Sequence, residues 1–140
     1  MTEPRTPNAE RGEMSLVLAG RPMGLRPSYE AIVAMEASLG RGLVDVARDA
    51  IAAKLSLGET AQIVTECVRA WGRETEDKDA AGAQPNRIGR LILDAPGGFH
   101  EVQRILSGLL SMAVTGGYDP EGNVKPAATT TMDGAVPAAG

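Results

Sequence analysis

The sequence predicts an α+β fold that is mainly α, in which a short N-terminal β-hairpin is followed by about five helices and both termini are disordered. Apolar residues alternate near the N-terminus and then recur at helical spacing through most of the chain. Aromatic residues make up only 3% of the sequence, so the core must be built from Leu, Ile, Val, Met and Ala. Such a core is expected to be helical.

The hairpin is expected over residues 14–26. Three apolar residues alternate with Ser15 and Val17, which is the period of a strand with one buried face. Gly20 and Pro22 provide turn residues before the second extended segment. The residues on the expected buried face are Met14, Leu16 and Leu18.

The first helix is expected over residues 29–39. Pro27 ends the extended run, and the Ser28 hydroxyl is placed to accept from the free amides of the first helical turn. Gly40 is expected to stop the helix. The apolar stripe of this helix is expected to comprise Tyr29, Ile32, Val33 and Leu39.

Two further helices follow by spacing. One face of the second is expected to carry Leu43, Val46, Ala47, Ala50 and Ile51. Ser56 and Glu59 form a capping-box pattern that opens the third helix, because each side chain can satisfy a backbone amide of the other. The third helix is expected to bury Val64, Cys67, Val68 and Trp71.

The last two helices are preceded by a polar stretch, residues 72–86, which is expected to be a flexible connection. The fourth helix is expected to bury Ile88, Leu91, Ile92 and Ala95, and the fifth Val102, Ile105, Leu106, Leu109, Leu110 and Ala113. The centre of the core is expected to comprise Ile32, Val46, Val64, Trp71, Leu91, Ile105 and Leu109.

Three segments divide the chain of 140 residues. Residues 1–11 contain prolines and charges without any period, and residues 115–140 are rich in Gly, Pro, Ala and Thr. Both segments are expected to be disordered, and residues 12–114 are expected to form a single globular domain.

Composition excludes several classes of protein. The formal net charge of −4 argues against nucleic-acid binding, which depends on clustered Lys and Arg. No run approaches the roughly 18 apolar residues that a membrane span needs, so no membrane contact is expected. Cys67 is the single cysteine, so an intramolecular disulfide is impossible, and a reducing, cytoplasmic location with a buried thiol is expected.

No catalytic, cofactor-binding or metal-ligating residues are expected, and the protein is not expected to be an enzyme. His100 is the single histidine and lies near no cysteine in the sequence, so neither a triad nor a metal site is indicated. The glycines form no phosphate-binding loop. Glu30 and Glu36 are read as carboxylates on helix surfaces rather than as an acid and a base.

Residues 11–49 resemble the start of the small tail proteins of gene transfer agents and phages that are grouped as tail assembly chaperones. Those proteins open with a short hairpin, an Arg-rich turn and a helix that ends in E-x-x-x-G. The matching residues are Gly12, Leu16, Leu18, Gly20, Arg21, Leu25, Arg26, Glu36 and Gly40. Pro27 and the long C-terminal segment depart from the pattern.

The resemblance implies a non-enzymatic role in tail morphogenesis, as an assembly chaperone or a protein associated with the tail tube. The implied partner is the tail tube or the tape measure protein, with self-association and retention in the particle left open. We assign partner binding to the hairpin, through Leu16, Val17, Leu18, Arg21, Leu25 and Arg26. The alternatives are a small bacterial regulatory or adaptor domain unrelated to phage, and a small enzyme.

Overall fold

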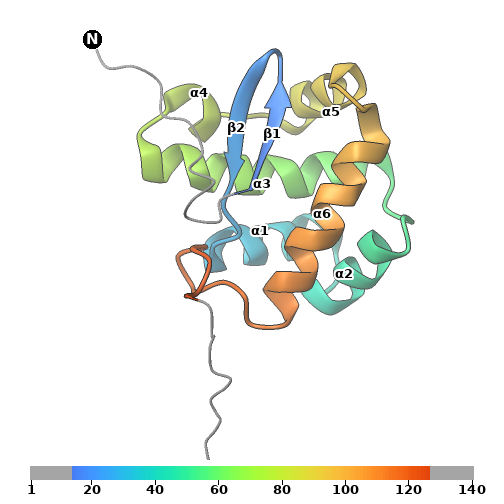
Figure 1. Ribbon diagram of the computed structural model, residues 1–140, viewed down its shortest axis with the longest axis vertical. Helices are drawn as coiled ribbons and strands as arrows, with labels where there is room; N and C mark the ends of the chain where they lie inside the picture. Colours follow the sequence, from blue (N-terminus) through green and yellow to red (C-terminus); the bar gives the residue numbers. More distant parts are fainter. Residues whose placement is uncertain (1–13, 127–140) are drawn as a thin grey trace, which may run out of the picture.

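The computed structural model describes residues 14–126 and confirms the predicted fold class: a two-stranded antiparallel hairpin is followed by helices (Figure 1). The elements are β1 (Met14–Leu18), β2 (Arg21–Leu25), α1 (Tyr29–Leu39), α2 (Leu43–Ile51), α3 (Leu57–Thr75), α4 (Lys78–Ala81), α5 (Pro85–Asp94) and α6 (Gly98–Val114). The predicted disorder of residues 1–11 lies outside the described residues.

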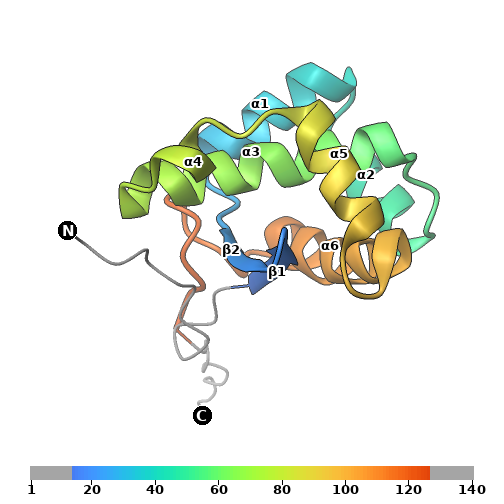
Figure 2. The same ribbon diagram turned by 90° about the horizontal axis from the view of Figure 1, so that it is seen from above.

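Helix α3 is the central element of the fold. It packs against α1, α4, α5 and β2, while α2 packs mainly against α6. Seen from above, the hairpin lies between α3 on one side and α6 on the other (Figure 2). Among the described residues, no helix combines the length and the apolar character that crossing a membrane requires.

The hairpin turn consists of Ala19 and Gly20, which both have positive φ, at 55° and 74°. Such a two-residue turn matches the right-handed twist of the strands. Pro22, which was expected in the turn, instead lies within β2 opposite Val17. The alternation of an antiparallel ladder makes this a non-hydrogen-bonded pair, so the missing N–H of proline costs no ladder bond.

The predicted helix ends are confirmed where capping residues specify them. The Ser28 hydroxyl accepts from the Ala31 amide, and Gly40 ends α1 in the left-handed region at φ 72°. Ser56 and Glu59 form the predicted capping box. The N-cap of α2 is Gly42, which has no side chain that could cap the helix.

Glu36 supplies the missing cap of α2. Its carboxylate accepts from the Leu43 amide at 2.8 Å, across the turn between α1 and α2. A carboxylate at a helix N-terminus also interacts favourably with the helix dipole. The position of Glu36 therefore has a structural explanation.

The buried face of α1 differs from the expected stripe. Tyr29 and Val33 are 63% and 43% exposed, whereas Ala31 and Met35 are buried. The helix is apolar on most sides, so periodicity could not select the face that packs against α3. In α2, Ile51 was likewise expected to be buried and is 60% exposed.

The predicted core centre is confirmed for its most buried members. Val46, Val64, Trp71 and Leu109 are at most 1% exposed. The other three predicted members, Ile32, Leu91 and Ile105, are partly buried and pack against this core.

Residues 72–86 are packed rather than flexible. Helix α3 runs through Gly72 to Thr75, and α4 then folds back onto it with Ala80 fully buried. A Cβ at Gly72 would lie 2.2 Å from the Ala81 backbone nitrogen, so only glycine permits this approach. The sequence does not predict α4 because this short helix lies in a polar stretch and buries a single alanine, which gives no apolar period.

Residues 115–126, which we call the strap, are also packed where disorder was expected. Tyr118 and Val124 form an isolated β-bridge, and the Tyr29 amide donates to the Pro120 carbonyl at 2.8 Å. The strap lies beside the start of α1 at the base of the hairpin (Figure 1). The expectation for residues 127–140 lies outside the described residues.

Candidate functional site

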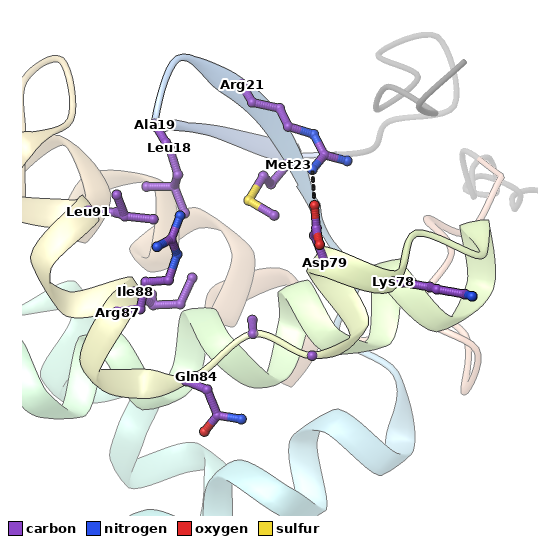
Figure 3. A pocket seen from close by; sticks show the side chains of 12 residues that line it. Leu18, Ala19, Arg21, Met23, Lys78, Asp79, Gln84, Arg87, Ile88 and Leu91 are labelled. Carbon is purple, nitrogen blue, oxygen red and sulfur yellow. Dashed lines mark ion pairs between the residues drawn. The ribbon is translucent and has the colours of Figure 1, made fainter. Parts of the chain in front are cut away.

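A groove of about 440 Å³ lies between the tip of the hairpin and the α4–α5 segment, and we call it the tip groove (Figure 3). Its apolar lining includes Leu18, Met23, Ala83, Ile88 and Leu91, and its polar lining includes Arg21, Lys78, Asp79, Gln84 and Arg87. The groove thus joins the hairpin to a segment about 60 residues later in the chain.

One wall of the groove is held by Arg21, which follows the hairpin turn directly. Its guanidinium forms an ion pair with Asp77 and lies 3.9 Å from the Asp79 carboxylate, the contact drawn in Figure 3. The Asp77 side chain also accepts from the Ala80 amide at 3.1 Å and so caps α4. Asp77 therefore fixes the hairpin tip and α4 together.

The opposite wall is formed by the first half of α5. Pro85 starts this helix, where its missing N–H costs nothing, and Ile88 turns inward at 3% exposed. Figure 3 shows the Arg87 side chain extending from α5 toward Leu18. Arg87 has no ion-pair partner among residues 14–126.

The six residues predicted to bind a partner are not equivalent in the structure. Leu16, Leu18 and Leu25 are at most 4% exposed and are part of the core. Direct contact of Leu16 or Leu25 with a partner would require the hairpin to leave its place. Of the six, only Leu18 and Arg21 line the tip groove.

The remaining two predicted residues lie elsewhere. Val17 is 45% exposed on β1, on the face of the hairpin opposite Leu16 and Leu18. Arg26 is 8% exposed and donates to the strap, to the Glu121 carbonyl at 3.0 Å and to Asn123 Oδ1 at 2.9 Å.

Sequence reasoning missed the α4–α5 side of the groove. Lys78 lies within residues 72–86, which are predicted to be a flexible connection, and Arg87 directly follows them. For this reason the sequence does not indicate either residue as part of a site. Two local signals mark helix starts there: Asp77 as an N-cap and Pro85 as a first helical residue. These signals locate the helices but do not show that they face the hairpin.

The residues considered for catalysis are dispersed. His100 and Glu30 are exposed on different helices, and Glu36 caps α2. Burial raises the pKa of the Cys67 thiol to about 12, so the thiol is a weak nucleophile. Within residues 14–126, no three His, Cys, Asp or Glu side chains gather in a way that could hold a metal ion.

A protein-family model described as "phage tail tube protein, GTA-gp10" matches residues 11–116. The matched stretch runs from just before β1 to just after α6, so it contains both walls of the tip groove. Most of the strap lies beyond it. No curated protein and no solved structure gives a significant match to the chain.

Proposed function

We propose that this chain, which belongs to the phage tail tube protein family of GTA-gp10, promotes tail morphogenesis by protein–protein binding and without enzymatic activity. Its family makes it a tail protein of a phage or gene transfer agent. The finer role we propose is that of an assembly chaperone or a protein associated with the tail tube. Its partner would be the tail tube or the tape measure protein, met in the cytoplasm of the producing cell.

The observation that carries this proposal is the tip groove. It is open at the surface, it is built only from elements within the family match, and the Arg21–Asp77 ion pair fixes the hairpin tip to α4 at one of its walls. Val17 and Pro22, which adjoin the groove residues Leu18 and Arg21 in the sequence, form an exposed cross-strand pair on the hairpin. Together they offer a preformed surface with apolar and charged parts, which suits docking of another polypeptide.

The test places a charge on this surface without disturbing the core. Val17→Asp is expected to leave the circular dichroism spectrum unchanged and to shift stability by about 0.5 kcal/mol or less, because the side chain is half exposed. It is expected to reduce both particle yield and recovery of tail tube or tape measure protein in a pull-down from producing cells, because an unpaired charge in an interface is costly. Val44→Asp, at a 50% exposed valine on α2, is the matched control.

The proposal fails if the Val17 variant folds and supports normal yield while His100→Ala or Glu30→Gln abolishes it. That result would favour a mechanism based on polar side chains. Mass spectrometry of purified particles then separates the two finer roles. A protein associated with the tail tube is retained in the particle, whereas a chaperone is recovered with its partner only before assembly is complete.

A further inference from the structure

We propose that the tip groove binds an acidic–aliphatic segment of a partner polypeptide, in which a carboxylate pairs with Arg87 and the neighbouring aliphatic side chain packs on Leu18, Ile88 and Leu91. The identity of that partner as a tail protein rests on the proposed function. The recognition chemistry does not, and it can be measured on the purified chain.

The apolar part of the groove is preformed. Leu18, Met23 and Ile88 are at most 8% exposed, so they are held in place by the core and need no ordering when a ligand binds. The groove volume of about 440 Å³ lies within the range of about 300–1,000 Å³ that is common for pockets binding small ligands. It therefore suits a few residues of a chain rather than a whole helix.

Among the described residues that line the groove, one cation is available to a ligand. Arg21 is committed to Asp77 and Asp79, and Figure 3 shows Lys78 pointing away from the groove. Arg87 extends toward Leu18 and makes no ion pair with any described residue. A guanidinium next to an apolar surface matches a carboxylate next to an aliphatic side chain, since its planar fork can donate two parallel hydrogen bonds.

The position of Arg87 in α5 independently favours an anion. The first turn of α5 contains no acidic residue, and its N-cap, Gln84, makes no side-chain capping bond. The positive end of the helix dipole therefore lies beside a cation, an arrangement that opposes helix stability. Arg87 therefore does not stabilise α5. A bound carboxylate would offset the repulsion between the Arg87 guanidinium and the positive end of the helix dipole.

The same geometry disfavours a polyanion such as nucleic acid. Asp79, whose side chain is 91% exposed, stands at the rim beside Arg21, and the whole chain carries a net charge of −4. Successive phosphates would meet these carboxylates, and among residues 14–126 they would find one guanidinium of the groove, that of Arg87, outside an ion pair. A ligand with a single carboxylate and an apolar side chain avoids this repulsion.

The test uses the full chain and a fluorescein-labelled peptide, Gly-Ser-Glu-Leu-Leu-Ser-Gly, in an anisotropy titration. We expect Arg87→Gln to weaken binding by about tenfold or more, because the variant loses a charge-assisted hydrogen bond to the peptide carboxylate. Arg90→Gln, at an exposed arginine of the same helix outside the tip groove, is the matched control and is expected to change affinity less than twofold.

Changes in the peptide identify the partner of Arg87. Replacing its Glu by Gln is expected to weaken binding to the native chain about as much as Arg87→Gln does, and to have little effect on the Arg87 variant, because the two changes remove one interaction. Replacing both Leu residues by Ser is expected to abolish binding. Amide shifts in a ¹⁵N titration should concentrate on Leu18, Ile88 and Leu91.

The inference is overturned if the peptide does not bind at millimolar concentration, or if Arg87→Gln and Arg90→Gln have equal effects. It is also overturned if the Gln peptide binds as well as the Glu peptide. These outcomes leave the proposed function standing as long as Val17→Asp still reduces particle yield. Conversely, Arg87-dependent peptide binding, combined with normal yield of the Val17 variant and loss of yield in His100→Ala or Glu30→Gln, would overturn the proposed function alone.

Discussion

Each end of the hairpin carries an arginine, and the chain surrounds these two arginines in different ways. At the base, Arg26 is covered by the strap, which accepts two hydrogen bonds from its guanidinium. At the tip, Arg21 is held by the carboxylates of Asp77 and Asp79, and the space beside it stays open as the tip groove. Residues of the chain itself cover the base of the hairpin, whereas the groove at the tip remains open to a partner.

The base is closed tightly but not perfectly. Gly122, with φ +90°, approaches so closely that a Cβ there would lie 2.6 Å from Arg26 Cγ. Yet the indole nitrogen of Trp71 and the hydroxyl of Tyr118 are buried with no hydrogen-bond partner among residues 14–126. Leaving such groups unpaired costs stability, so the base depends on packing more than on polar complementarity.

The largest expected effect concerns the packing of Trp71 on Gly24. Trp71→Ala is expected to lower the free energy of unfolding by about 3–5 kcal/mol, because it removes a side chain that is 1% exposed. Gly24→Ala is expected to cost about 1–3 kcal/mol, since its Cβ would lie 2.4 Å from the indole. Urea denaturation of both variants and of the double variant measures these losses.

The double variant provides the decisive comparison. If the clash with the indole is the cause, Gly24→Ala becomes nearly neutral once Trp71 is replaced. Strictly additive losses would contradict this account of the base.

An intermediate effect is expected from removing each arginine in turn. Arg26→Ala should lower stability by about 1.5–3 kcal/mol, the value of a hydrogen bond from a charged group, and should accelerate hydrogen exchange at Gly122 and Lys125. Arg21→Ala should instead accelerate exchange in α4, because it leaves the buried carboxylate of Asp77 without its cation. Hydrogen exchange followed by NMR tests both, and equal effects of the two variants on the strap would refute the separation of tip and base.

The smallest expected effect near neutral pH is that of Tyr118→Phe. The hydroxyl has no partner to lose, so the variant is expected to lie within about 1 kcal/mol of the native chain. Burial raises the pKa of Tyr118 from 10.0 to about 12. The native chain should therefore lose stability relative to the variant as the pH rises from 10 toward 12, because the unfolded state releases the phenolic proton first.

Urea denaturation near neutral pH and at about pH 11 checks this sign. Burial also raises the pKa of Cys67 to about 12, but Cys67 is present in both proteins and so contributes to both curves. A native chain that gains stability relative to Tyr118→Phe above pH 10 would show that the phenol ionises more easily in the folded state.

Much of the fold was predictable because its signals are local. The capping box of Ser56 and Glu59 and the cap of Ser28 involve bonds between residues three apart, so they act wherever the helix goes. The hairpin was predictable for a similar reason, since alternation along five residues and a glycine at the turn specify it. These elements needed no information about the rest of the chain.

The candidate site was less predictable. Leu18 and Arg21 were expected to bind a partner, but nothing in their neighbourhood in the sequence indicates Arg87 as the opposite wall. Helix α1 shows the same difficulty in the core. It is apolar on nearly all sides, and contact with α3 buries Ala31 and Met35 rather than Tyr29 and Val33.

The sequence by itself thus determined the hairpin and the helix ends that have local capping residues, because capping and alternation depend on residues a few positions apart. Tertiary structure alone decided that Arg21 and Arg26 are bound by other residues of the chain and that Arg87 is left available to a ligand. Arg26 meets partners 95 and 97 positions away, and Arg21 meets Asp77 56 positions away. Contacts at such separations depend on how all the intervening helices pack. A pattern within a few neighbouring residues does not specify that packing.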